Sequence, residues 1–169
     1  MNLQFYMEKL HSSKIFQMFR DEMKDAYFCS GFFTLDNEGK DNQRHLDFYS
    51  PEKKQVFSFK LNSDVEILPT EKMSELNKNF PVPEKLSENI DFEFDEIEKL
   101  IFDEMEKKEM KTKIQKIIIS LQNFHDRSVL VCTVFISMLG LLKVQIDLRE
   151  KKIIEFEKKS FMDFVKKAK

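Results

Sequence analysis

The sequence predicts an α+β fold of two tandem repeats, each a helix followed by three antiparallel strands, with the helices packed on the sheets. Apolar residues recur at helical spacing near the N-terminus and again near residue 97, and each time segments with apolar residues at strand spacing follow. The 169-residue chain has 3 glycines and 4 prolines, as expected of regular elements joined by polar turns. This length suits one compact domain or two small units.

The N-terminal segment, residues 3–24, predicts one broken helix or two short helices. Ser12 and Ser13 lie at the break, where a hydroxyl can cap the second segment. The apolar residues at helical spacing are Leu3, Tyr6, Met7 and Leu10, followed by Ile15, Phe16, Phe19 and Met23.

The first set of strands follows this helical segment. Residues 26–35 are apolar and aromatic, and residues 45–49 and 55–61 alternate apolar and polar side chains, with SPEKK between them as a hairpin loop. Residues 65–67 predict a short further strand. The polar stretch 36–41 is interpreted as a turn and not as a calcium-binding loop, because its acids are out of register with those of such a loop.

The domain boundary is predicted in a segment where periodicity fades and prolines appear. Pro69, Pro81 and Pro83 lie there, so we expect a first unit over residues 1–68, a partly ordered connection over 69–92 and a second unit over 93–169, or one merged domain. Asp95 is the expected cap of the helix that opens the second unit. Its apolar stripe is Ile97, Leu100, Ile101 and Met105.

The second unit contains the most apolar stretch of the chain, residues 128–148. Its uncharged part is too short for a membrane-spanning helix, which needs about 20 apolar residues, and it is rich in β-branched side chains. It predicts a hairpin that turns at residues 137–140, preceded by a strand over 113–122. A third strand over 153–157 and a terminal helix that begins at Ser160 are expected to follow.

An internal repeat is suggested when the chain is shifted against itself by 87 residues without a gap. EMK at 22–24 then meets EMK at 109–111, Phe48 meets Phe135, and Leu61 meets Leu148. Helical segments meet helical segments and strands meet strands, so we interpret the pattern as a duplicated helix-plus-sheet unit, with chance similarity as the alternative. In this alignment Cys132, Val134 and Ile136 replace the polar face of the 45–49 strand.

This order of elements, with the charged turn in QIDLREKKIIEFE and the helix start SFMDFV, resembles the PepSY-like modules and is broadly similar to the cystatin-like fold. The resemblance covers residues 113–165 and, less closely, 10–67, and it extends to small archaeal-type proteins. PepSY-type modules are commonly exported and are inhibitory or regulatory, so the resemblance implies a regulatory role. No residue of this chain matches a functional motif of the family.

Composition and motifs exclude several classes of function. A net charge of −2 and a pI near 6.0 give no electrostatic basis for nucleic-acid binding. The sequence contains none of the phosphate-binding, serine-hydrolase or zinc-protease motifs, so we expect no catalytic residue, cofactor or metal. The three histidines, His11, His45 and His125, have no second ligand at metal spacing.

Three hypotheses of function remain, led by a non-enzymatic interaction or regulatory protein. Its partner would be an unknown protein or a second copy that pairs through a sheet face or edge. The second hypothesis is a small-molecule or lipid-binding protein with a phenylalanine-lined pocket, and the third is an enzyme using Cys132, His45 or the acids near Asp36. The candidate apolar pocket or interface residues are Phe28, Phe32, Phe57, Phe59, Cys132, Val134 and Ile136.

The predicted location is the cytoplasm. Cys29 and Cys132 lie in separate apolar runs, and the N-terminus lacks the pattern of a signal peptide, so both are expected to be buried free thiols. Residues 149–169 hold eight basic and four acidic residues. They could bind an acidic partner or a membrane surface, or their phenylalanines could simply pack on the sheet.

Overall fold

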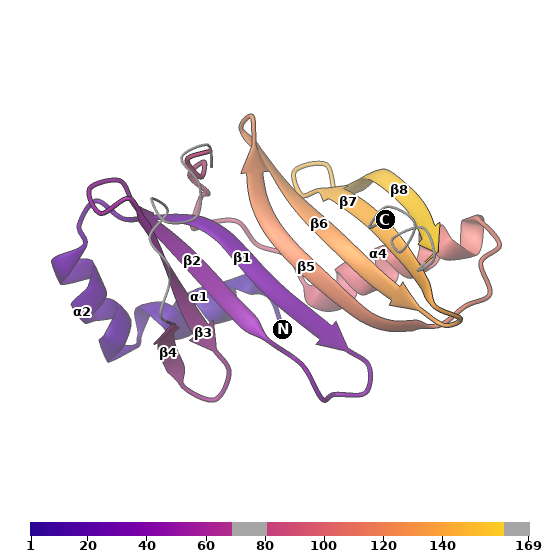
Figure 1. Ribbon diagram of the computed structural model, residues 1–169, viewed down its shortest axis with the longest axis horizontal. Coiled ribbons are helices and arrows are strands. Elements are labelled where there is room, and N and C mark those ends of the chain that lie inside the picture. Colours follow the sequence, from indigo (N-terminus) through magenta and orange to yellow (C-terminus); the bar gives the residue numbers. More distant parts are fainter. Residues whose placement is uncertain (69–80, 161–169) are drawn as a thin grey trace, which may run out of the picture.

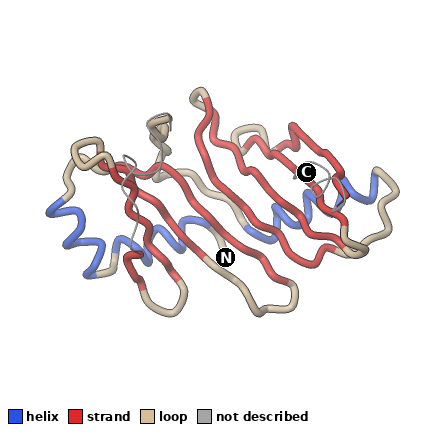
Figure 2. Tube along the Cα trace, viewed as in Figure 1, coloured by secondary structure: helices blue, strands red, loops and turns tan. Residues whose placement is uncertain are grey.

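A computed structural model of the chain describes residues 1–68 and 81–160, which form one eight-stranded antiparallel sheet and three helices (Figures 1 and 2). The strand order is β4-β3-β2-β1-β5-β6-β7-β8. The elements are α1 (Leu3–His11), α2 (Lys14–Glu22), β1 (Tyr27–Asp36), β2 (Arg44–Ser50), β3 (Gln55–Leu61), β4 (Val65–Leu68), α4 (Phe94–Lys107), β5 (Ile114–Phe124), β6 (Arg127–Ile136), β7 (Gly140–Asp147) and β8 (Lys152–Ser160).

The α+β class and the antiparallel sheet are confirmed, but each half of the sheet has four strands instead of three. β1 and β5 pair side by side at the centre, so residues 1–68 and 93–160 share one continuous sheet. Outward from this central pair the strands follow one another in chain order, from β1 to β4 on one side and from β5 to β8 on the other. Every neighbouring pair is antiparallel, and every pair except β1–β5 joins strands that are consecutive in the chain, as in hairpins.

The helices begin where short polar side chains can cap them, with one exception. The Asn2 side chain accepts from the backbone N–H of Phe5, and the Ser13 side chain accepts from that of Phe16, which confirms the break between two short helices. The expectation that Asp95 caps α4 is wrong. The cap position is Glu93, whose side chain makes no capping hydrogen bond, and Asp95 lies in the first turn, where its charge favours the helix dipole.

All three helices lie on one face of the sheet, and the core fills the space between them. α1 and α4 run behind the sheet in the view of Figure 1. Under α2 the core is aromatic: Phe16 contacts Phe48 and Phe59, with ring centroids 5.0 and 5.3 Å apart. Under α4 it is aliphatic, and the strand residues buried there are Ile117, Ile119, Leu130, Val134, Leu142, Val144 and Ile146.

The ungapped 87-residue alignment is wrong in its detail, because it places side chains on opposite faces. Phe48 packs against the helices, whereas Phe135 alternates with the buried Val134 and Ile136 and faces the other side. Cys132, Val134 and Ile136 therefore belong to the helix-covered core. A shift of one residue in the alignment of two strands moves every side chain to the opposite face of the sheet, and no pattern in the aligned segments indicates such a shift.

The described part of the connecting segment, residues 81–92, packs against the core. Leu86 and Phe92 are buried in the core, and the backbone N–H of Leu86 donates to the carbonyl of Phe28. The Gln4 side chain of α1 donates to the carbonyls of Glu88 and Ile90. Residues 69–80 of the predicted connection, and the predicted terminal helix after Ser160, lie outside the described residues.

Candidate functional site: the open face of the sheet

The seven predicted pocket or interface residues do not share one surface. Five of them are buried on the helix-covered side, and Phe57 is half-buried there against Phe19, with ring centroids 5.2 Å apart. Phe32 lies on the opposite face, beside His45. The five buried residues are Phe28, Phe59, Cys132, Val134 and Ile136.

The face of the sheet that points away from the helices, here called the open face, is apolar at its centre. Val131, Thr133 and Phe135 of β6 alternate with the buried residues of that strand and are each partly exposed. The neighbouring strands continue this surface, because Ile118 lies opposite Thr133 and Leu141 lies opposite Phe135. Among the described residues no helix covers this region (Figure 1). Phe32 of β1 lies in the same row as Val131, with Ser120 of β5 between them.

One row of directly opposed residues crosses seven strands on the open face and ends in opposite charges. The β3 end is Lys60 and the β8 end is Glu155, which also forms an ion pair with Lys143 at 3.5 Å. The row runs Lys60, His45, Phe32, Ser120, Val131, Gln145 and Glu155.

A polar cluster beside the apolar centre has unused hydrogen-bonding capacity. The Ser30 hydroxyl donates to Oδ2 of Asp47 at 2.7 Å, but Oδ1 of Asp47 and Nε2 of His45 are buried without a hydrogen-bond partner among the described residues. Burial raises the pKa of Asp47, opposed by the hydroxyls of Ser58 and Ser30. Burial also lowers the pKa of His45, opposed by the charge of Asp47.

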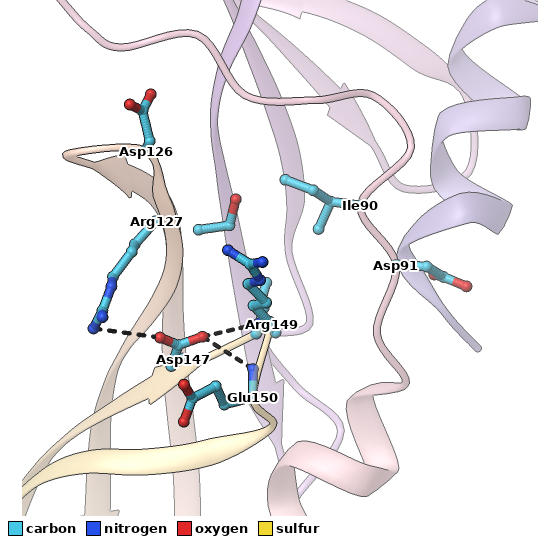
Figure 3. Close-up of a pocket in the computed structure, with 9 residues that line it drawn as sticks. Ile90, Asp91, Asp126, Arg127, Asp147, Arg149 and Glu150 are labelled. Atoms are coloured by element: carbon cyan, nitrogen blue, oxygen red, sulfur yellow. Dashed lines mark hydrogen bonds and ion pairs between the residues drawn. The ribbon is translucent and has the colours of Figure 1, made fainter.

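A second feature is a polar cleft of about 430 Å³ at the end of the sheet, between the β5–β6 turn, the β7–β8 turn and residues 90–91 (Figure 3). Asp147 is buried at this cleft, and its Oδ1 accepts from the backbone N–H groups of Arg149 and Glu150 at 2.9 and 3.1 Å. Its Oδ2 lies 3.7 Å from Nη1 of Arg127. Asp147 therefore holds the turn, and the Arg149 side chain extends into the cleft on the side facing Ile90.

The chemistry expected of a thiol enzyme is not assembled. Cys132 is buried on the helix-covered face and His45 lies on the open face, with β1 and β5 between their strands, so these two residues do not form a nucleophile–base pair. Burial raises the pKa of the Cys132 thiol to about 12, and burial together with the charge of Asp47 does the same for Cys29. Both thiols are therefore poor nucleophiles at neutral pH.

Neither a metal-binding cluster nor a membrane-spanning helix is present in the described part of the chain. No group of three or more His, Cys, Asp or Glu side chains there could hold a metal ion. None of the helices there is long and apolar enough to cross a membrane.

Comparison with known proteins gave one likeness at the level of fold. No family model matches the chain, and no curated protein does. The crystal structure of a putative lipoprotein from Clostridium difficile 630 is similar, with a TM-score of 0.54 and 16% identity, over 86% of this chain and 90% of that one. At this identity the likeness concerns the fold alone. The resemblance to PepSY-like and cystatin-like modules stays a prediction.

The sequence carries a signal for the open face, but the internal repeat points to the wrong residues. The first arm of the 128–148 hairpin has apolar side chains on both faces, and this predicts cover on both faces. The structure covers one face with α4. The uncovered side chains are those of Val131, Thr133 and Phe135, one position removed from the residues that the sequence repeat indicated.

Proposed function

We propose that the protein is a non-enzymatic interaction protein that binds its partner through the open face of the sheet. The supporting observation is the partly exposed apolar centre formed by Phe32, Ile118, Val131, Phe135 and Leu141. An antiparallel sheet with one face in water usually places polar residues on that face. Apolar side chains gathered on an uncovered face are typical of a protein–protein interface.

The proposed partner is a second copy of the chain. Two open faces related by a twofold axis along β5 would place β1 over β6, β2 over β7 and β3 over β8 of the other copy. Phe32 would then lie near Val131 of the second copy, and Lys60 near its Glu155. The apolar centres of the two copies would thus face each other, and each end of the row would face an opposite charge on the second copy.

Sedimentation equilibrium of the full chain over a range of concentrations tests the proposal. The native protein should form a dimer, and Val131→Asp should leave a folded monomer because it places a charge in the apolar centre. Phe102→Asp is the matched control, since Phe102 is 45% exposed on α4, away from the open face, and should not change association. A native protein that stays monomeric at every concentration contradicts the proposed partner.

A charge exchange tests the orientation of the two copies. Lys60→Glu alone and Glu155→Lys alone should each weaken the dimer by placing like charges together, and the double variant should recover most of the loss. Because Glu155→Lys also breaks the ion pair with Lys143, recovery in the double variant is the informative result. Losses that simply add would show that the two residues do not meet.

A small-molecule site is the second candidate function, supported by an apolar slot beside the Asp147 cleft. The slot measures about 260 Å³ and shares Asp91 and Leu148 with the cleft, into which Arg149 extends. The slot is also lined by Glu96 and Lys151, and the cations Lys151 and Arg149 would hold the carboxylate of an organic acid with an apolar body. Calorimetric titration with octanoate should show binding that Arg149→Gln weakens, and no heat of binding would exclude this class of ligand. The apolar lining of the slot is Phe92, Ile97, Leu100, Ile146 and Leu148.

The cytoplasm remains the proposed location, supported by the two buried free thiols, Cys29 and Cys132. Export as a lipoprotein, which the name of the similar Clostridium protein suggests for that protein, is the competing possibility. Protease added to intact cells should leave a cytoplasmic chain uncut, whereas a surface-exposed chain would be degraded.

We also infer that the two halves of the sheet descend from one duplicated helix-plus-sheet unit. The strand order on either side of the β1–β5 pair supports this, since it runs outward in sequence in both directions. An experimental structure in which the backbone of β1–β4 fails to superpose on that of β5–β8 would contradict the duplication.

A further inference from the structure

The turn between β6 and β7 differs from the other hairpin turns of the described chain because its tip is apolar. Met138 is 91% exposed and Leu139 is 78% exposed. The remaining turns between consecutive strands carry mostly polar or charged tips at residues 37–43, 51–54, 62–64, 125–126 and 148–151, apart from Gly39, Pro51 and the part-buried Leu148. Exposed leucine and methionine at such a position contribute nothing to the core.

The backbone at this tip is also unfavourable for the residues that occupy it. Met138 and Leu139 have φ angles of 69° and 59°, in the left-handed region that glycine and asparagine adopt most easily. Hairpin turns with two successive positive φ angles favour Asn-Gly. Two large apolar side chains at these positions therefore cost stability, and a role for the side chains themselves accounts for their presence.

Lysines surround the apolar tip. The backbone N–H of Ser137 donates to the carbonyl of Lys113 at 3.0 Å, which fixes the turn beside the start of β5. On the other side, Lys158 and Lys159 at the end of β8 lie opposite Leu142 and Leu141. Lys113 and Lys158 are exposed and have no ion pair among the described residues, whereas Lys159 pairs with Glu157 at 3.8 Å.

We propose that this tip, Met138 and Leu139 with Lys113 and Lys158 beside them, binds the surface of an anionic lipid bilayer. The two apolar side chains would enter the boundary between headgroups and acyl chains, and the lysines would lie among the anionic headgroups. Two apolar side chains and a few lysines give weak, reversible attachment. The inference is independent of the proposed dimer, although a twofold axis along β5 would direct both tips to the same side.

Vesicle co-sedimentation with the full native chain tests this inference. The protein should bind vesicles of phosphatidylcholine mixed with phosphatidylserine, bind pure phosphatidylcholine vesicles much less, and lose affinity as salt rises. The variant Met138→Asn with Leu139→Gly should bind about 100-fold less, since each apolar side chain accounts for about tenfold or more. The same variant should melt no lower than the native chain, because Asn-Gly suits the turn.

Variants that remove single lysine charges distinguish binding of the tip to an anionic lipid surface from nonspecific adhesion of the protein to vesicles. Lys113→Gln and Lys158→Gln should each lower the affinity about fivefold. Lys53→Gln with Lys54→Gln, at the tip of the β2–β3 turn, is the matched control and should have no effect.

Three results would overturn the inference. One is no binding to either kind of vesicle, and another is undiminished binding by the Asn-Gly variant. The third is loss of self-association in that variant without a change in vesicle binding, which would assign the tip to an interface between copies.

Discussion

Phe33 of β1 lies directly opposite Ile119 of β5, and both side chains are fully buried. The Phe33 ring also contacts Phe94 at the start of α4, with centroids 5.0 Å apart. This pair therefore joins the aromatic core of the first half to the aliphatic core of the second. The two halves share a sheet and also a continuous interior.

Replacing Phe33 should destabilise the whole molecule. Phe33→Ala is expected to lower the free energy of unfolding by about 3–5 kcal/mol, because it leaves a cavity where the two cores meet. Urea unfolding followed by circular dichroism should remain one transition at a lower midpoint. Phe102→Ala, at an exposed position on α4, should change stability by less than about 0.5 kcal/mol. Two separate transitions in the Phe33 variant would show that the halves fold independently.

Removing the side chain that holds the β7–β8 turn should also be costly. Asp147→Ala leaves two backbone N–H groups without an acceptor and is expected to lower the free energy of unfolding by about 1–3 kcal/mol. Glu150→Ala changes the neighbouring exposed acid and should have little effect. Equal losses in the two variants would mean that the hydrogen bonds to Asp147 do not support the turn.

The two cysteines should be inert in the native protein. With the pKa of each thiol raised to about 12 by burial, neither Cys29 nor Cys132 should react with a disulfide reagent at pH 8 until denaturant is added. Full labelling of two thiols is expected in guanidinium chloride. Rapid native labelling of Cys132 would revive the thiol-enzyme hypothesis.

Asp47 should make stability depend on pH in a direction opposite to that of most carboxylates. Burial raises its folded-state pKa above the unfolded value of about 3.9, so the folded state binds the extra proton between these two pKa values. Stability from this group is therefore present at low pH and is lost as pH rises through the raised pKa. His45 acts in the other direction, since its lowered pKa reduces stability as pH falls below about 6.5.

The variant Asp47→Asn tests how much the Asp47 carboxylate contributes to the pH dependence of stability. It should gain stability relative to the native chain as pH rises above 4, and the gain should level off once Asp47 is ionised in the native protein. Chemical unfolding at a series of pH values measures this, with Asp64→Asn at an exposed position as the control. A gain that does not change with pH would show that Asp47 is not held in a desolvated state.

The local structure of this protein could be read from the sequence closely. All eight strands and the three described helices were expected within a few residues, because apolar periodicity and polar turns are local properties. The segment 55–61 was predicted with the observed bounds of β3. The hairpin turn at 137–140 was also expected at its observed position. What the sequence determined was therefore the elements, their order and the presence of excess apolar side chains in the 128–136 arm.

Only the tertiary structure decided which side chains meet. The face on which Cys132 or Val131 lies depends on the length of the turns and on the register of β6 with β5, and a change of one residue in either reverses a whole strand. The pairing of β1 with β5 joins residues about 90 positions apart, such as Gly31 and Leu121, and no local pattern encodes it. That pairing completes the open face, whereas the pairings of β5 with β6 and of β7 with β8 bring the lysines near the β6–β7 tip, so the physical basis of both features is non-local.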